Sequence, residues 1–235
     1  MLPSMVDSRH NRDGRLEEEL HKISVMKIDG NRAKKGVAAI SRGRPRQFDE
    51  ENALTAALKV FWRKGFEGAS VRDLTKAMGI DRKSMYASFG NKEELFRKAL
   101  DLYEKEKQAF IRSALELPTA RAVAEALLHG SLDIQTSKSD PHGCLKVMSS
   151  VSCSEQSKSV RAEIVARRLD DETALTARFQ RAQAEGDLPG GTDPAGYSRC
   201  LYAIIQGMAV QAASGASRHD LERLVEASLR MWPSP

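Results

Sequence analysis

The segment that most constrains this chain is residues 66–90, where two short helical patterns are separated by a single glycine. Ser70 begins the first pattern and Asp73 follows three residues later, which is the spacing of a helix N-terminal capping box. Gly79 ends that pattern, because glycine adopts the left-handed conformation of a helix C-terminus without steric cost. Asp81 then caps a second helix that is expected to start one residue later. The spacing therefore predicts two short helices joined by a tight turn.

The two faces of the second predicted helix differ in chemistry. Met85 and Phe89 are four residues apart and are expected to point into a core. The opposite face carries two cations, a hydroxyl and a phenol, which are groups that bind phosphates and the edges of bases. These outward residues are Arg82, Lys83, Ser84 and Tyr86. The pattern predicts a helix-turn-helix that enters the major groove of DNA, and a plain helical hairpin in a larger bundle is the alternative.

An apolar stripe and a cationic string precede this motif. Residues 48–64 place apolar side chains on one stripe, so this helix is expected to brace the other two. Before it, Arg42, Arg44 and Arg46 alternate with a glycine and a proline, which disfavour a helix. A flexible cationic arm of this kind suits the minor groove of DNA, whose negative potential attracts arginine.

Three stretches of this region, residues 43–49, 57–70 and 84–96, together resemble the N-terminal domain of the tetracycline-repressor (TetR) family. The resemblance implies an all-helical homodimer in which each subunit presents one recognition helix to half of a near-palindromic operator. It also implies that a C-terminal domain binds a small molecule.

The same resemblance implies which residues of the motif lie at the DNA. Tyr86 and Lys92 match family positions that typically touch phosphates. Four other residues match positions that tend to lie at the DNA, and we add the residue that begins the first helix of the motif. These five candidates are Thr75, Arg82, Lys83, Ser84 and Ser70.

The charge distribution agrees with a DNA-binding N-terminal region. Residues 1–48 carry 11 Lys and Arg against 6 Asp and Glu, and residues 49–100 carry 10 against 8. Residues 101–235 carry 16 against 18, so the rest of the chain is slightly acidic. The positive charge thus lies where it would neutralise phosphates.

The chain divides into three predicted parts. Residues 1–40 are expected to form a basic, disordered leader, although a dispensable or mis-assigned leader is equally consistent with their composition. Residues 41–90 form the arm and the helix-turn-helix domain, and residues 91–235 a helical ligand-binding and dimerisation domain. A single long helix is expected over residues 91–116, connecting the two domains.

The last two predicted helices, 193–214 and 216–231, carry apolar stripes that would form a four-helix bundle across a two-fold axis, or pack on their own subunit instead. The residues predicted for a dimer interface are Leu201, Ile205, Met208, Leu224 and Leu229. The residues predicted to line a ligand pocket, which plain packing would also explain, are Met148, Tyr202 and Gln206.

The three cysteines, Cys144, Cys153 and Cys200, are too few and too scattered for a disulfide framework or a CxxC metal site. We expect them to be reduced and mostly buried, and a redox switch is the alternative. No metal or other cofactor is expected.

No catalytic motif is present. The chain lacks GxSxG, HExxH and Walker sequences, and its five histidines share no evident site, so we expect no enzymatic activity. No apolar run is long enough to span a membrane and the N-terminus has no signal-peptide core, so a cytoplasmic protein without membrane partners is expected.

The sequence therefore predicts an all-α protein with a three-helix DNA-binding head and a larger helical domain. The function that fits is a sequence-specific transcriptional regulator, a repressor that an unknown small-molecule effector releases from its double-stranded operator. The alternatives are a non-specific or architectural DNA binder, a redox-sensing regulator that uses its cysteines, and a small-molecule carrier or processing protein that shares the fold.

Overall fold

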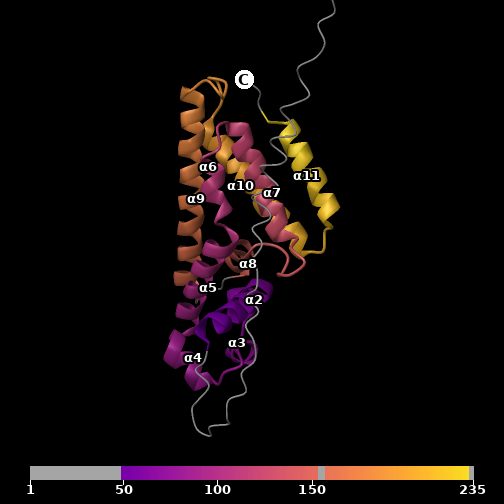
Figure 1. Cartoon of the computed structure of the whole chain (residues 1–235). Coiled ribbons are helices and arrows are strands. Elements are labelled where there is room, and N and C mark those ends of the chain that lie inside the picture. The colour runs from indigo at the N-terminus through magenta and orange to yellow at the C-terminus, as the bar shows by residue number, and fades with distance from the viewer. Residues whose placement is uncertain (1–48, 153–156, 233–235) are drawn as a thin grey trace, which may run out of the picture. The chain divides into compact units, whose positions relative to one another are not determined.

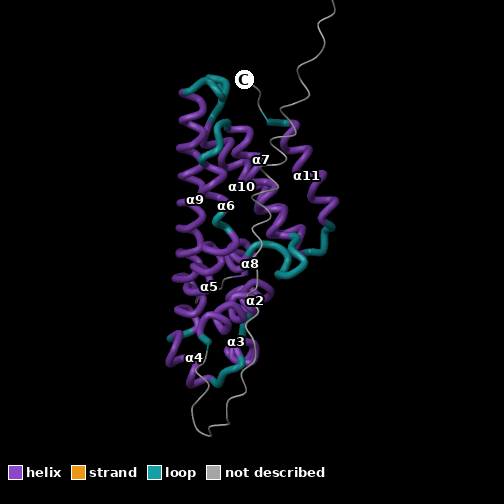
Figure 2. Tube along the Cα trace, in the orientation of Figure 1, coloured by secondary structure: helices purple, strands orange, loops and turns teal. Residues whose placement is uncertain are grey.

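Helices provide all the regular secondary structure in the described part of the chain, which confirms the predicted all-α class (Figure 2). The structure, a computed structural model, describes residues 49–152 and 157–232. The predicted leader and cationic arm lie outside these residues. The helices are α2 (Glu50–Gly68), α3 (Val71–Met78), α4 (Arg82–Phe89), α5 (Lys92–Lys107), α6 (Phe110–Leu115), α7 (Ala120–Gln135), α8 (Leu145–Ser152), α9 (Lys158–Ala184), α10 (Pro194–Ala213) and α11 (Arg218–Arg230).

Helices α2, α3 and α4, here called the head, pack around one apolar core together with α5. Ala57, Leu58 and Phe61 are buried on the predicted stripe of α2. The Phe61 ring meets the Phe96 ring of α5 edge-on, with 5.0 Å between the ring centroids. The brace predicted from the apolar stripe is therefore present, and its partner is α5 as well as the two short helices.

A glycine interrupts the last turn of α2. Gly65 has φ 68° and ψ 175°, which is a conformation that residues with a Cβ rarely adopt. The interruption follows Lys64, where the sequence pattern predicted the end of the helix. It brings Phe66 into the core, with its ring 5.1 Å from the Phe96 ring.

The single helix predicted over residues 91–116 is wrong, because α5 ends at Lys107 and α6 begins at Phe110. The Phe110 ring lies against Gly130 of α7, where a Cβ would come within 2.3 Å of a ring carbon. Only a glycine permits this close approach, so packing of α6 on α7 explains the break better than any local signal. The two residues between these helices include no glycine or proline, so the sequence gives no local sign of the break.

Helices α6 to α11, here called the body, contain a second apolar cluster formed mainly by α7, α9, α10 and α11. The buried guanidinium of Arg178 on α9 donates to the carbonyls of Leu115, Leu117 and Pro118 at 2.7–3.1 Å. These hydrogen bonds tie α9 to the segment that joins α6 to α7.

The core of the head continues into the body through α8 and α9. Leu145 of α8 and Ile164 of α9 are buried in the same cluster as Trp62 of α2. The Trp62 indole donates its N–H to the carbonyl oxygen of Gly143 at 3.2 Å, and its ring meets the Tyr103 ring edge-on at 4.8 Å. Figure 1 shows α8 lying between α2 and the remaining helices of the body. The head is thus packed onto the body rather than joined to it by α5 alone.

The loop between α7 and α8 is held to the head and to α5 by charge. The Asp140 carboxylate lies 3.3 Å from the Lys59 amine of α2 and 2.7 Å from the Lys107 amine of α5. Farther along, Gly143 has φ 88°, and a Cβ there would lie 2.9 Å from the carbonyl oxygen of Ala209. The path of this loop is therefore fixed both by an ion-pair cluster and by a glycine.

Among the described helices, none combines the length and the apolar composition needed to cross a lipid bilayer.

Candidate functional site

The turn between α3 and α4 has the predicted chemistry. The Ser70 hydroxyl accepts a hydrogen bond from the Asp73 backbone N–H at 3.0 Å, and the Asp73 carboxylate accepts one from the Ser70 N–H at 3.2 Å. Gly79 ends α3 with φ 69° and ψ 27°, and Asp81 caps α4 by accepting from the Ser84 N–H at 2.7 Å. The predicted capping box, glycine turn and second cap are confirmed.

The caps also hold two carboxylates in their charged form. The hydrogen bond from Lys64, at 2.9 Å, and those from Ser70 lower the pKa of Asp73 to about 2. The hydrogen bond from the Ser84 backbone lowers the pKa of Asp81. Both carboxylates are therefore ionised at neutral pH, and each lies at the positive N-terminal end of a helix.

Helix α4 presents the predicted cationic face. Met85 and Phe89 are buried, while Arg82 and Lys83 are exposed. Tyr86 is 39 % exposed, and the Arg82 guanidinium lies 5.7 Å from the centroid of its ring. A rigid, exposed helix surface with two cations and a phenol can contact both phosphates and base edges.

Three other predicted DNA contacts have structural partners of their own. The Thr75 hydroxyl donates within α3, to the Val71 carbonyl oxygen at 3.0 Å. The Ser70 hydroxyl donates to Asp73 at 2.7 Å, as part of the capping box. The Lys92 amine, at the start of α5, lies 4.4 Å from the centroid of the Phe66 ring. Each group is placed by these contacts before any DNA is present, and contact with DNA stays a prediction for all three.

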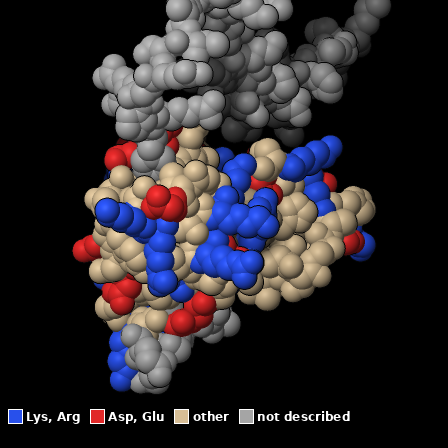
Figure 3. Space-filling model, turned by 90° about the horizontal axis from the view of Figure 1, so that it is seen from below, with Lys and Arg blue, Asp and Glu red and all other residues tan. Residues whose placement is uncertain are grey.

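Sequence reasoning missed a set of exposed cations on α2 and α3. Lys and Arg side chains gather on this end of the molecule, which Figure 3 shows from below. A surface groove of about 280 Å³ between the two helices is lined by three of them and by Asp73. In the sequence, these cations could have been recognised from their positions on the polar sides of the two amphipathic helices. The missed cations are Arg63, Lys64, Arg72 and Lys76.

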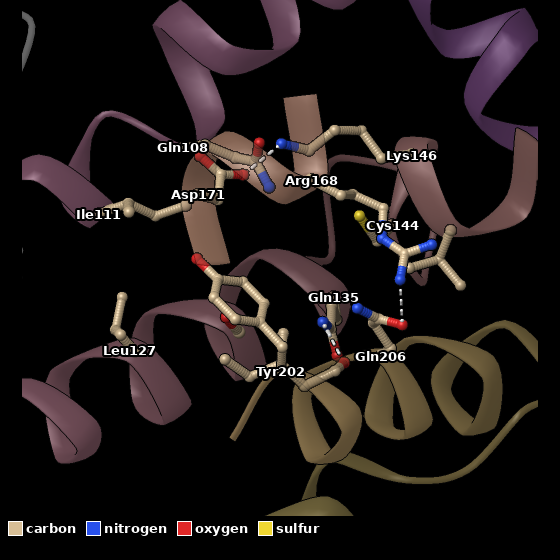
Figure 4. Close-up of a pocket in the computed structure, with 13 residues that line it drawn as sticks. Gln108, Ile111, Leu127, Gln135, Cys144, Lys146, Arg168, Asp171, Tyr202 and Gln206 are labelled. Carbon is tan, nitrogen blue, oxygen red and sulfur yellow. Dashed lines mark hydrogen bonds and ion pairs between the residues drawn. The ribbon is translucent and has the colours of Figure 1, made fainter. Parts of the chain in front are cut away.

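A cavity of about 40 Å³ lies between the C-terminal end of α5 and helices α6, α7, α8, α9 and α10 (Figure 4). Tyr202 and Gln206, both predicted to line a pocket, lie in its wall, and the third predicted residue, Met148, does not. Three charged side chains also line it: Lys146 of α8, and Arg168 and Asp171 of α9.

The charges around this cavity are partly paired. The Lys146 amine lies 2.7 Å from the Asp171 carboxylate and 3.3 Å from the Glu104 carboxylate. Burial, followed by the charges of Asp171 and Glu172, raises the pKa of Tyr202, so its phenol keeps its proton at neutral pH. The cavity wall therefore offers hydroxyl, amide and guanidinium groups rather than a phenolate.

Three of the five residues predicted for a dimer interface are buried within their own subunit. Leu201, Met208 and Leu229 are 2 %, 0 % and 7 % exposed, because they lie in the core of their own subunit and cannot cover a partner. Ile205 and Leu224 are half-buried against the same core. Three large apolar side chains that stay exposed on the neighbouring surfaces are Val165 and Leu169 of α9 and Val210 of α10.

The described cysteines differ in environment. Cys144 is buried beside the cavity, where its sulfur accepts a hydrogen bond from the Tyr103 hydroxyl at 3.4 Å. Cys200 is exposed, which corrects the expectation of burial for that residue, and Cys153 lies outside the described residues. Arg42, Arg44 and Arg46 of the predicted arm also lie outside them. Over residues 49–152 and 157–232, no group of His, Cys, Asp or Glu side chains has the arrangement of a metal site.

Known proteins resemble this chain both in its head and over most of its length. Residues 53–99 match the family described as "Bacterial regulatory proteins, tetR family". The chain is 35 % identical over 196 residues to the HTH-type transcriptional repressor ComR of Escherichia coli (strain K12), which covers 82 % of this chain and 93 % of ComR. It is 46 % identical over 61 residues to the HTH-type transcriptional repressor BdcR of the same organism, which covers 26 % of this chain and 31 % of BdcR.

A solved structure extends the similarity to three dimensions. A cysteine mutant of the TetR family transcriptional regulator CifR, complexed with a 26-bp double-strand operator DNA, superposes with a TM-score of 0.76 at 38 % identity. The match covers 81 % of this chain and 100 % of the CifR chain.

Proposed function

The chain belongs to the TetR family of bacterial regulatory proteins, and from this premise we propose that it is a homodimeric, sequence-specific DNA-binding repressor that a small-molecule effector releases. The observation that carries the proposal is the exposed, cationic outer face of α4, presented by a turn that is capped at both helices. Because the target is DNA, the same proposal places the protein in the cytoplasm and assigns it no enzymatic activity.

In this proposal α4 is the recognition helix. Arg82, Lys83, Ser84 and Tyr86 engage the major groove, where side-chain donors and acceptors read the edges of the bases. Around them, other residues hold the DNA backbone and fix the register of the helix, because phosphate contacts position a protein without specifying sequence. These positioning residues are Ser70, Thr75 and Lys92, and beyond them Arg42, Arg44 and Arg46 of the arm at the adjacent minor groove.

A dimer follows from the geometry of reading a near-palindrome. Two recognition helices related by a two-fold axis reach successive major grooves only if they lie about 34 Å apart. The exposed apolar side chains Val165, Leu169 and Val210 provide a surface on α9 and α10 for the partner subunit. We therefore place the interface on these residues rather than on the buried stripes of α10 and α11.

The cavity is connected to the head by a short chain of contacts. Cys144 lines the cavity and accepts a hydrogen bond from Tyr103, whose ring packs on Trp62 of α2. Trp62 is in turn bonded to Gly143, the residue before Cys144. A ligand that binds one arrangement of α8 better than another therefore shifts the position of the head, and operator affinity falls by the difference in binding free energy.

The first experiment is selection of bound sequences from a random DNA pool, followed by competition between the selected site and scrambled DNA. A regulator is expected to prefer its own site by about 1000-fold or more. A preference close to one would instead identify a non-specific or architectural DNA binder.

Two variants test the placement of α4 on DNA. Lys92→Ala should weaken binding to all sequences and reduce the slope of log affinity against log salt by about one unit, since one phosphate contact is lost. Tyr86→Ala should weaken binding without the same change in slope. Arg112→Ala, an exposed cation of α6, is the matched control and should leave both quantities unchanged. Unchanged affinity in Lys92→Ala and Tyr86→Ala would contradict the proposed docking.

A further inference from the structure

We propose that the cavity of the body binds a short-chain hydroxy acid, a molecule of a few carbons with a carboxylate and a neighbouring hydroxyl. The inference rests on the proposed function in one respect, because this ligand would then be the effector. The binding itself depends only on the chemistry of the cavity wall.

Four buried polar atoms of residues that line the cavity have no hydrogen-bond partner within the described residues. They are Oε1 of Gln108, Oε1 of Gln135, Nε of Arg168 and the hydroxyl of Tyr202. They come from the C-terminal cap of α5 and from α7, α9 and α10. A buried polar atom without a partner is destabilising, so four such atoms around one small cavity indicate a binding site for a polar ligand.

The hydrogen bonds that these residues already make determine which donors and acceptors a ligand must supply. The Gln135 amide nitrogen donates to the Ile205 carbonyl oxygen at 3.0 Å, so the amide oxygen remains as an acceptor. The Arg168 guanidinium donates through Nη2 to Gln206 at 2.9 Å, which leaves its Nε–H as a donor. At these two residues, therefore, Gln135 needs a hydrogen-bond donor from the ligand and Arg168 needs an acceptor.

Charge makes the accepting group an anion. Lys146 is neutralised by Asp171 and Glu104, as described above. Arg168, by contrast, takes part in no ion pair within 4.0 Å among the described residues, and its guanidinium is bonded to the neutral Gln206 amide. A half-buried guanidinium without a counter-ion favours a carboxylate ligand, and charge-assisted hydrogen bonds are about twice as strong as neutral ones. The Tyr202 hydroxyl, kept protonated, can donate to the same carboxylate.

The size and the apolar side of the cavity limit the rest of the ligand. Ile111 and Leu127 lie on the side opposite Arg168 and Gln206, as Figure 4 shows. With a volume of only about 40 Å³, the cavity suits a short hydrocarbon end and excludes a long acyl chain. A simple carboxylate lacks the donor for Gln135, and a diol lacks the charge for Arg168. A hydroxy acid supplies both.

Isothermal titration of the full-length protein without DNA tests the inference with three probes of equal carbon number: 2-hydroxybutyrate, butyrate and 1,2-butanediol. The hydroxy acid should bind about tenfold tighter than either comparison compound, which corresponds to one hydrogen bond or one charge-assisted contact. Arg168→Gln should abolish the preference over the diol, because it removes the charge that favours the carboxylate. Arg161→Gln, an exposed arginine of the same helix, should change nothing.

The outcomes separate the ligand from the proposed function. Equal or absent binding of the three probes, or a preference that survives in Arg168→Gln, would overturn the inference. Binding of 2-hydroxybutyrate with the expected preference, but without release of the selected operator, supports the ligand class and contradicts its role as effector. Failure to bind any operator contradicts the proposed function and leaves the titration result standing.

Discussion

The head and the cavity of the body differ in how far their polar side chains are hydrogen-bonded. In the head, the side chains that cap α3 and α4 bond to backbone groups three residues away, as Ser70, Asp73 and Asp81 do. In the cavity wall, Arg168 and Tyr202 each keep a buried polar atom that has no described partner. The capping groups of the head thus find their partners within the folded chain, whereas in our proposal the unpartnered atoms of the cavity wall find theirs in a ligand. Recognition of DNA and recognition of a ligand are in this way assigned to regions of different chemistry.

The largest expected effect is on stability, and it tests whether the core of the head is packed more tightly than the cavity wall. Leu74 is fully buried in the head core, and Leu74→Ala should lower the free energy of unfolding by about 2–5 kcal/mol. Leu127→Ala is the matched control, because Leu127 is buried but borders the cavity and so has fewer atoms packed against it. Urea unfolding of the two variants measures the difference, and a larger loss for Leu127→Ala would reverse the comparison.

The next effect compares two tryptophans. Trp62→Phe should lower the free energy of unfolding by about 1–3 kcal/mol, because the Gly143 carbonyl oxygen is left buried without its donor. Trp232→Phe should be less destabilising, because the Trp232 indole N–H has no described partner to lose. The measurement is again urea unfolding, and equal losses would mean that the Trp62 hydrogen bond contributes nothing to the junction between head and body.

A smaller effect depends on pH. Burial by itself raises the pKa of Asp140, but the hydrogen bonds and charges of Lys107 and Lys59 outweigh it, so the pKa lies below its usual value. A carboxyl whose pKa is lowered by folding stabilises the protein above its unfolded pKa of about 4, and this stabilisation is lost as the pH falls below that value. Asp140→Asn should therefore be less stable than the wild type by about 1 kcal/mol at pH 7, and the gap should narrow below about pH 4. A gap that stayed constant between pH 7 and pH 3 would contradict the ion-pair cluster.

The smallest expected effect is on the cavity side. Tyr202→Phe should change the free energy of unfolding by less than about 0.5 kcal/mol, or raise it slightly, because the hydroxyl that it removes has no described partner. Ser198→Ala on the same helix removes a buried hydroxyl that donates to the Glu172 carbonyl oxygen at 3.1 Å, and it should be destabilising by about 1 kcal/mol. Thermal and urea unfolding of the two variants measure the difference. A marked loss of stability in Tyr202→Phe would show that the Tyr202 hydroxyl already has a hydrogen-bond partner.

The same contrast explains what could be predicted from sequence. The caps and the turn of the head involve residues three to five positions apart, so Ser70, Asp73, Gly79 and Asp81 were readable as a pattern. The break between α5 and α6 was not, because it depends on contact between Phe110 and a glycine in another helix. Local chemistry predicts local structure, and tertiary contact overrides it where a distant residue intervenes.

The candidate sites follow the same rule. The outward residues of α4 could be named because one short helix carries them all, while the cations of α2 and α3 were overlooked as ordinary polar surface. In the cavity, Tyr202 and Gln206 lie on one helix and were named, but Arg168 and Gln135 come from other helices and share no spacing with them. Leu201 and Met208, which were named for the interface, are buried in their own subunit. An apolar stripe identifies a buried face without saying whether the same chain or a partner buries it.

The shared core of head and body has a practical consequence for protein engineering. Modular sensors are often assembled by exchanging effector domains between regulators, with the cut placed where one domain ends in sequence. In this protein such a cut after Gly90 would separate Trp62 from Gly143 and Leu145, which complete its packing. A working hybrid would have to carry over α8 and the preceding loop together with the head. The segment to be exchanged is therefore not continuous in the sequence.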